Sequence, residues 1–455
     1  MIQEIKSIRP IVDDSLKQVF IETYGCQMNV NDSEVVLAIL QECGYALCDS
    51  IGKADLILVN TCSIRENAEQ RIFGRLDIFR LEKKRRKGLI VGVIGCMAER
   101  MKDQLLEHPV VDIVVGPDAY RSLPELLLAV NPDNKQIDVK LSRTETYDDI
   151  TPVRMDKNGV SAYISIMRGC NNVCSYCIVP YTRGAERSRD PQTIIREAKE
   201  LYANGYKEVN LLGQNVDSYR WKGESENDNV DFAKLLEMVA QIAPDLRVRF
   251  STSHPKDMTT DVVKMMAKYP NICKHIHLPV QSGSSDMLLK MNRKYDREKY
   301  LSQIATIREL IPDCSITTDV IVGFSGESEE DYQLTLSLFE EVKFDSAFMF
   351  YYSERPGTKA SRHYPDDISI EVKTERLNKI IELQNKLSLE SNKADVGKVF
   401  EVLIEGASKR SESQLIGRTS QNKVCVFTTD KHKAGDYATV RVTSCTSATL
   451  MAELI

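Results

Sequence analysis

Apolar and polar positions in the first 130 residues follow the pattern of strands that alternate with helices. Residues 18–25 (QVFIETYG) have the composition of a strand, and a helical pattern capped by Asn31 or Asp32 follows at 31–44. Near-continuous apolar runs, typical of parallel strands covered on both faces, lie at residues 54–62, 88–96 and 111–116. Helical segments at 63–86 and 98–107 separate them. This alternation predicts a doubly wound parallel sheet.

A second series of strands and helices begins near Ser161, after a polar stretch. Six short apolar segments are expected to be strands, at residues 162–169, 208–213, 246–253, 275–280, 315–324 and 346–353. Amphipathic segments between them, such as 191–204 and 329–342, predict an incomplete (β/α) barrel of parallel strands. A long charged helix is expected over residues 369–394.

The last part of the chain changes to short β-branched segments separated by turn residues. Five of them, at residues 398–406, 413–419, 423–429, 436–443 and 449–455, predict a small β-barrel. We therefore expect an α/β protein with an N-terminal arm, a sheet domain, a linker, a barrel domain and a C-terminal β-barrel, at residues 1–17, 18–130, 131–155, 156–395 and 396–455.

Composition narrows the class of protein. Hydrophobic residues make up 42% and charged residues 28% of 455 residues, which suffices for the cores of two or three domains. The net charge of −6 means that any contact with RNA comes from local patches. The opening residues carry acids and lack a continuous apolar run, and no later stretch reaches the roughly 18 apolar residues of a membrane span. We expect a cytoplasmic protein without a signal peptide.

Three of the twelve cysteines fall where successive parallel strands end. Cys26, Cys62 and Cys96 follow the first three predicted strands, about one strand–helix unit apart. The carboxyl ends of parallel strands form the edge at which open α/β sheets bind ligands. Buried structural thiols are the alternative for any one of them, since free cysteine is often buried. Three at one topological position favour a ligand set.

Three further cysteines, Cys170, Cys174 and Cys177, crowd the loop after the first barrel strand in the stretch RGCNNVCSYC. Structural zinc requires four ligands, commonly as two spaced pairs, and no second pair follows. Soft thiolates also select iron–sulfur clusters. Three thiolates on four irons leave one iron open to a substrate or cofactor, and the loop lies at the catalytic end of such a barrel.

This spacing, with Tyr176 before the third cysteine, resembles the radical S-adenosylmethionine (SAM) superfamily. The motifs YGCQMN, NTCSIREN, LLGQNV, HLPVQSGS and IVGFSGE together resemble its methylthiotransferase branch, and the resemblance covers nearly the whole chain. Two positions depart from the pattern of that branch: Ser325 replaces a usual proline, and Arg168 stands where many members have an acid. Neither position is a ligand cysteine.

The resemblance implies SAM and two [4Fe–4S] clusters as cofactors. Cys170, Cys174 and Cys177 would hold the cluster whose open iron binds SAM. Cys26, Cys62 and Cys96 would hold an auxiliary cluster that supplies sulfur, so all six cysteines would be both metal ligands and catalytic. The C-terminal β-barrel would be a TRAM domain.

The motifs are most similar to branch members that add a methylthio group to carbon 2 of N6-isopentenyladenosine, which is N6-dimethylallyladenosine, beside the tRNA anticodon. Two alternatives share this mechanism, with N6-threonylcarbamoyladenosine in tRNA or an aspartate of a ribosomal protein as substrate. An electron-transfer iron–sulfur protein is the alternative from another class, but it requires four ligands per cluster. The expected partners are the tRNA anticodon stem-loop and an electron donor such as a flavodoxin or ferredoxin, and the chain is expected to be a monomer.

Further site residues are expected around these cysteines. Tyr176, held between two ligands, is expected beside the adenine of SAM. Polar side chains near the ends of barrel strands are expected to bind the remainder of SAM, namely Gln214, Asn215, Gln281, Ser282 and Asp319. The stretch directly after the triplet is expected to contact substrate through Arg183, Glu186, Arg187 and Arg189. For His275 and His277, two apart on one strand, a hydrogen-bonded barrel wall is favoured over a metal pair.

Overall fold

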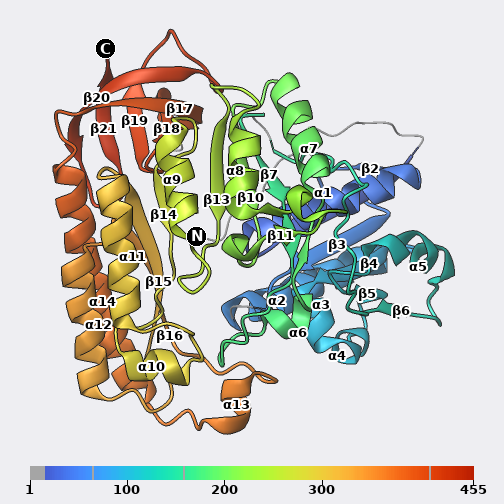
Figure 1. Ribbon diagram of the computed structural model, residues 1–455. Helices are drawn as coiled ribbons and strands as arrows, with labels where there is room; N and C mark the ends of the chain where they lie inside the picture. Colours follow the sequence, from blue (N-terminus) through green and yellow to red (C-terminus); the bar gives the residue numbers. More distant parts are fainter. Residues whose placement is uncertain (1–15, 64–65, 157–158, 409–410) are drawn as a thin grey trace.

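The structure is a computed structural model that describes residues 16–63, 66–156, 159–408 and 411–455. Most of the expected N-terminal arm (1–17) lies outside the described residues. Figure 1 shows three parts: an N-terminal α/β layer (blue to teal), a central barrel of strands and helices (green to orange), and a small C-terminal barrel (red). This arrangement confirms the predicted fold class.

The N-terminal part is a six-stranded, all-parallel sheet in the order β2-β1-β3-β4-β5-β6. Its strands are β1 (Lys17–Thr23), β2 (Tyr45–Leu47), β3 (Leu56–Thr61), β4 (Ile90–Gly95), β5 (Ile113–Val115) and β6 (Gln136–Asp138). Its helices are α1 (Gln27–Glu42), α2 (Glu66–Arg85), α3 (Cys96–Met101), α4 (Asp103–Leu106) and α5 (Leu123–Ala129), with the short η1 (Tyr120–Ser122). Two separate apolar cores, one on each face, make the sheet doubly wound.

The sheet differs from expectation at both of its edges. β2 was not expected, and β6 lies within residues 131–155, which the sequence suggests as a linker. Both are three-residue strands whose pattern is too short to stand out. They are fixed by pairing with β1 and β5, the strands that would otherwise be the exposed edges.

Helix α1 also begins earlier than its polar residues suggest. It starts at Gln27, with Cys26 as its N-cap residue, so Asn31 and Asp32 lie inside the helix. Both side chains are buried and bond to the barrel domain instead of capping: Asn31 Nδ2 donates to the carbonyl of Tyr163, and Asp32 accepts from Arg168. Similarly, the helix expected at 98–107 is two short helices that meet at Lys102, whose φ is 43°.

The central barrel consists of two three-stranded parallel sheets. One has the order β13-β10-β7, from β7 (Ser161–Ser165), β10 (Glu208–Leu212) and β13 (Arg247–Ser251). The other has the order β14-β15-β16, from β14 (His275–His277), β15 (Ser315–Val322) and β16 (Ser346–Tyr351). A bridge between Val248 and Ile272 joins them. The described strands β7 and β16 each pair on one side only, so the barrel is incomplete as expected.

Helices cover the outer face of the barrel around one large apolar core. They are α7 (Pro191–Ala203), α8 (Phe232–Ala240), α9 (Thr260–Lys268), α11 (Arg297–Leu310), α12 (Glu329–Val342) and α14 (Ile370–Lys393). Shorter elements lie near its ends: β8 (Met167–Arg168), α6 (Val179–Arg183), β9 (Arg187–Ser188), β11 (Arg220–Trp221), β12 (Val230–Asp231), α10 (Ser285–Lys290) and α13 (Lys359–His363), with η2 (Val216–Ser218) and η3 (Glu226–Asp228).

The C-terminal part is a closed five-stranded barrel in the order β17-β18-β19-β21-β20. Its strands are β17 (Val399–Ser408), β18 (Ser411–Thr419), β19 (Val424–Thr428), β20 (Tyr437–Cys445) and β21 (Leu450–Leu454). Two β13 arginines fix it to the central barrel: Arg247 donates to the carbonyls of Glu401 and Arg418, and Arg249 to that of Thr419.

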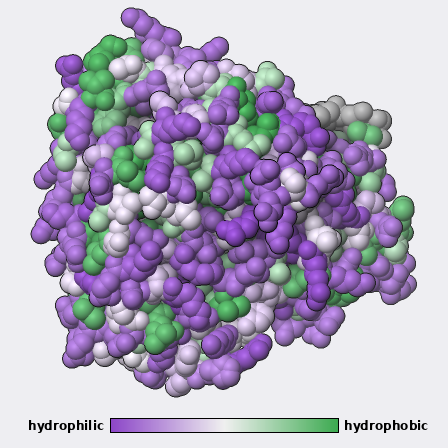
Figure 2. All heavy atoms as spheres, viewed as in Figure 1, coloured by the Kyte–Doolittle hydropathy of each residue, from purple (hydrophilic) through white to green (hydrophobic). Residues whose placement is uncertain are grey.

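The surface is mostly hydrophilic on the face shown in Figure 2, with small scattered apolar patches. Among the described residues, no helix is long and apolar enough to cross a membrane.

Candidate functional site

Cys26, Cys62 and Cys96 lie at the carboxyl ends of β1, β3 and β4, which are neighbours in the sheet. Cys26 caps the start of α1, Cys62 follows β3 directly, and Cys96 is the first residue of α3. Cys62 and Cys96 are buried, whereas Cys26 is exposed. The expected convergence at one sheet edge is therefore present.

Two glycines allow this close approach. Gly25 has a φ of +122°, and a Cβ added to it would lie 2.4 Å from Cβ of Cys62. Gly95 has a φ of +91°, and a Cβ there would lie 2.4 Å from Oδ1 of Asn60. Any other residue would be strained at these φ values and would push the strand ends apart. The two glycines therefore allow the chain segments that carry the cysteines to lie close together.

A buried arginine from the barrel domain places a positive charge beside this cysteine set. Arg183, the last residue of α6, donates from Nε to Sγ of Cys96 at 3.1 Å. A hydrogen bond with Cys62 lowers the pKa of Cys26 to about 6, and the charge of Arg183 contributes in the same direction. Burial raises the pKa of Cys96, which Arg183 partly offsets. Metal ions bind the thiolate form of cysteine, and the charge of Arg183 favours that form. The surroundings of these cysteines therefore fit a metal cluster.

The second set, Cys170, Cys174 and Cys177, lies on one loop after β8. Gly169 starts the loop with a φ of +78°, and a Cβ there would lie 2.1 Å from the carbonyl oxygen of Ala185. The amide of Cys177 donates to the carbonyl of Cys174 at 3.0 Å, which curls the loop. Burial raises the pKa values of Cys170 and Cys177 to about 12, so a metal must displace their protons.

Arg293 stands beside this loop, and sequence reasoning did not single it out. It donates from Nη1 to Sγ of Cys174 at 3.4 Å and from Nη2 to the carbonyl of Pro279 at 2.8 Å. Each cysteine set thus has one buried guanidinium that donates to a ligand sulfur. Such donors stabilise negative charge on thiolates and on cluster sulfur.

A polar network lies next to the triplet at the end of β10. Asn172, between two of the cysteines, and Asn215 both donate to Oδ2 of Asp257, at 3.0 and 2.7 Å. Among the described residues, the buried Oδ1 of Asn215 and Oε1 of Gln214 have no hydrogen-bond partner. Unpaired buried acceptors fit a bound group that carries N–H or O–H donors, as the amino and ribose groups of SAM do.

The other residues expected to bind SAM, namely Gln281, Ser282 and Asp319, each have different contacts within the protein. Gln281 has a φ of 71° and bridges to Val320 through its backbone. The hydroxyl of Ser282 lies against α12, 3.3 Å from Oγ1 of Thr335. Asp319 lies on β15 with Oδ1 3.4 Å from Nε2 of His277. Contact of these side chains with SAM stays a prediction.

Tyr176 belongs to a small apolar cluster and packs edge-on against Phe324, with ring centroids 6.5 Å apart. His275 and His277 share one partner, Oγ1 of Thr317, at 3.0 Å each. No three His, Cys, Asp or Glu side chains of the described chain form a group suited to a single metal ion. In a cluster each thiolate binds a different iron, which places the ligands further apart than one ion would.

The arginines after the triplet are buried and bonded to protein groups. Arg183 and Arg187 pair with Asp32 and Asp118 of the N-terminal part, both at 2.8 Å, and Arg189 pairs with Glu197 on α7. Glu186, in contrast, accepts from the amide of Asn171 at 3.1 Å at the surface. Substrate contact by these four residues stays a prediction.

Comparison with known proteins divides the chain in the same way as the fold. Residues 164–339 match the radical SAM superfamily, residues 18–116 the uncharacterized protein family UPF0004, and residues 393–455 the TRAM domain. A tRNA-2-methylthio-N(6)-dimethylallyladenosine synthase of Phocaeicola vulgatus is 58% identical over 442 residues, 97% of this chain and 96% of that protein. The chain belongs to this synthase family. Relatives of the same name from Bacteroides thetaiotaomicron (97% and 96% covered) and Porphyromonas gingivalis (96% and 95%) are 58% and 54% identical.

Two solved structures resemble the fold of this chain at low sequence identity. TsrM of Kitasatospora setae, a radical SAM methyltransferase with tryptophan and a SAM analogue bound, has a TM-score of 0.54 at 14% identity. The match covers 73% of this chain and 72% of TsrM. OxsB, a cobalamin-dependent SAM radical enzyme, has a TM-score of 0.52 at 14% identity, over 82% and 56% of the two chains. These likenesses concern the fold alone.

Proposed function

We propose that this chain is a radical SAM methylthiotransferase that converts N6-dimethylallyladenosine beside the tRNA anticodon into its 2-methylthio derivative. The observation that supports this proposal most is structural. Three cysteines lie at the carboxyl ends of three parallel strands of one domain, three more lie on one loop after β8 of the other domain, and each set lies beside one buried arginine. Relatives named for this activity are up to 58% identical over nearly the whole chain.

The chemistry explains why two cysteine sets are useful. A C–H bond on an aromatic ring is inert to polar attack. When bound, a [4Fe–4S] cluster with SAM on its open iron supplies radical chemistry, and a second cluster supplies sulfur. In this proposal Cys170, Cys174 and Cys177 hold the first cluster, and Cys26, Cys62 and Cys96 hold the second.

In this proposal the protein's own residues bind SAM and orient the ligand cysteines. The unpaired oxygens of Gln214 and Asn215 would accept hydrogen bonds from SAM, and Tyr176 would pack against its adenine. The guanidinium of Arg293 holds Cys174 in place for its iron. The two domains contact each other through buried ion pairs, which keeps both cysteine sets at fixed positions.

RNA binding is proposed for the C-terminal barrel. Its exposed cations, Lys398, Lys431, Lys433 and Arg441, offer contacts to phosphates on a chain that is acidic overall. The target base must leave its stack at a cost of a few kcal/mol, which an anticodon loop allows more easily than a duplex. We further propose that the chain acts as a cytoplasmic monomer and receives electrons from a flavodoxin or ferredoxin.

The test is anaerobic reconstitution with iron and sulfide, followed by SAM, a reductant and substrate RNA. Transfer RNA with N6-dimethylallyladenosine should yield the 2-methylthio nucleoside by mass spectrometry, together with 5′-deoxyadenosine. Parallel reactions contain transfer RNA with N6-threonylcarbamoyladenosine, or ribosomal protein. If methylthio product forms only in one of those parallel reactions, the substrate of that reaction is the correct one and the proposed substrate is wrong. Absence of 5′-deoxyadenosine would contradict radical chemistry.

A further inference from the structure

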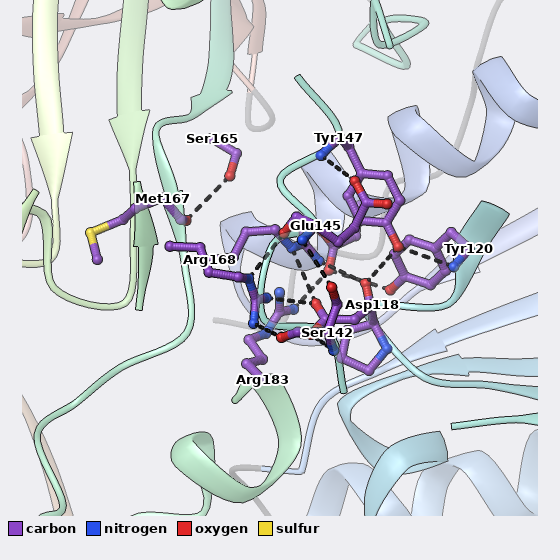
Figure 3. Close-up of polar contacts among 12 residues, drawn as sticks. Asp118, Tyr120, Ser142, Glu145, Tyr147, Ser165, Met167, Arg168 and Arg183 are labelled. Carbon is purple, nitrogen blue, oxygen red and sulfur yellow. Dashed lines mark hydrogen bonds and ion pairs between the residues drawn. The ribbon is translucent and has the colours of Figure 1, made fainter. Parts of the chain in front are cut away.

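The contact between the N-terminal sheet and the barrel contains a buried charge network with an excess of cations. Three arginines of the barrel domain, Arg168, Arg183 and Arg187, meet two aspartates of the N-terminal part, Asp32 and Asp118. All five are at most 8% exposed. Figure 3 shows Arg168 and Arg183 side by side, facing Asp118, Tyr120 and Tyr147. Counted over its direct ion pairs, the network has three positive charges and only two negative charges.

Arg183 is the member of this network that reaches the cysteines. Its Nη2 donates to Asp32 at 2.8 Å and to Oδ1 of Asn29 at 3.1 Å, while its Nε donates to Sγ of Cys96 at 3.1 Å. Its Nη1 is buried without a hydrogen-bond partner among the described residues. An unpaired buried guanidinium N–H is costly, so a further acceptor is expected on this side.

Arg183 is also rigidly connected to the other cysteine set. It ends α6, and the next residue, Gly184, accepts a hydrogen bond from the amide of Cys170 at 3.1 Å. Gly169 packs closely against Ala185. The side chain of Arg183 therefore enters the N-terminal domain from a backbone segment that supports the radical SAM triplet. At 3% exposure, the guanidinium is not accessible to an RNA on the surface.

We propose that Arg183 is a positioning residue of the auxiliary cluster: it donates to the sulfur of Cys96 and to the cluster, whose negative charge completes the buried network. The inference rests on the proposed function, because it requires that Cys26, Cys62 and Cys96 hold a cluster. Hydrogen bonds to sulfur and a nearby positive charge stabilise the reduced form of a cluster, so Arg183 raises its reduction potential.

The test measures the potential of the auxiliary cluster, not turnover. The full-length chain with Cys170, Cys174 and Cys177 replaced by alanine isolates that cluster, and a redox titration monitored by electron paramagnetic resonance gives its midpoint. Arg183→Gln should shift the midpoint to a more negative value with the iron content retained. Arg183→Lys keeps the charge and should give a smaller shift.

Arg187→Gln is the matched control. It removes a cation from the same network, but none of the hydrogen bonds that the structure gives Arg187 reaches a cysteine. Its midpoint should shift less than that of Arg183→Gln, because it loses a more distant charge and no hydrogen bond to sulfur. An unchanged midpoint in Arg183→Gln, or an equal shift in Arg187→Gln, would overturn the inference. Absence of iron from the parent itself would instead overturn the auxiliary cluster, and with it the proposed function.

Discussion

Arg168 and Asp32 form a buried ion pair, with Nη1 2.8 Å from Oδ1, that joins the strand before the radical SAM triplet to helix α1. Arg168 also lies over the ring of Tyr147, 4.9 Å from its centroid. The pair connects positions 136 residues apart in the sequence. It fixes the domain carrying one cysteine set against the domain carrying the other.

Replacing Asp32 by asparagine should weaken this interface strongly. Removing one partner of a buried pair leaves an uncompensated charge, at a cost of about 3–5 kcal/mol. In this variant Arg183 loses its carboxylate partner, and Arg168 keeps only the longer contact with Asp118 at 3.6 Å. The first unfolding transition in urea, measured on the cofactor-free chain at pH 7, should move to lower urea. Asp133→Asn, at an exposed turn, should leave it unchanged.

The effect of Asp32 should also depend on pH. Burial opposes ionisation, but the charges of Arg168 and Arg183 prevail and lower the pKa of Asp32 below its ordinary value. A carboxyl with a lowered folded pKa stabilises the fold above its unfolded pKa, near 4, and that contribution is lost as pH falls through the folded pKa. The difference between wild type and Asp32→Asn should therefore shrink below about pH 4. A constant difference down to pH 3 would contradict this assignment.

Gly25→Ala should impair the auxiliary cysteine set selectively. The added Cβ would overlap Cβ of Cys62, and the φ of +122° disfavours alanine. Iron bound per chain should fall toward half, while reductive SAM cleavage by the other set continues. Gly74→Ala on α2, where nothing lies within 4 Å of the new Cβ, is the control and should retain full iron.

Tyr176→Ala should weaken SAM binding and leave the iron content intact. The ring is held between two ligand cysteines and packs on Phe324, so it presents a fixed surface for an adenine. Equilibrium binding of SAM to the reconstituted enzyme measures the effect. Tyr181→Ala, a nearby exposed tyrosine, serves as the control. Equal SAM affinity in wild type and Tyr176→Ala would remove the assignment.

RNA affinity should depend on the exposed cations of the C-terminal barrel. Deleting that barrel would expose Arg247 and Arg249 and disturb the central barrel, so charge reversal is the cleaner test. Lys431→Glu with Lys433→Glu should weaken transfer RNA binding and reduce the salt slope by roughly 0.7–0.9 for each phosphate that the barrel no longer neutralises. SAM cleavage without RNA should persist. If Lys264→Glu on α9 weakens binding equally, the effect is not specific to this barrel.

Much of the fold, and the positions of the cysteines within it, could be predicted from local patterns in the sequence. Cys26, Cys62 and Cys96 could be placed because each ends a continuous apolar run, and parallel strands bring such ends together. The start of α1 could not be predicted, since the partners of Asp32 lie more than a hundred residues away.

The role of Arg293 was missed for the same reason. Its hydrogen bond to Cys174 spans 119 residues and follows no periodic pattern. Arg183 was selected from its position after the triplet, but its direction into the N-terminal domain depends on how the two domains pack. Contacts across a domain boundary are set by three-dimensional packing, which single-chain periodicity does not encode.

The most direct test of the central claim is a pair of triple variants. With Cys26, Cys62 and Cys96 replaced by alanine, the account predicts about half the iron, continued reductive cleavage of SAM, and no methylthio product on transfer RNA. With Cys170, Cys174 and Cys177 replaced, it predicts that the other half of the iron remains and that 5′-deoxyadenosine is absent. Methylthio nucleoside formed by the first variant, measured by mass spectrometry, would contradict the account and leave those three cysteines as structural thiols.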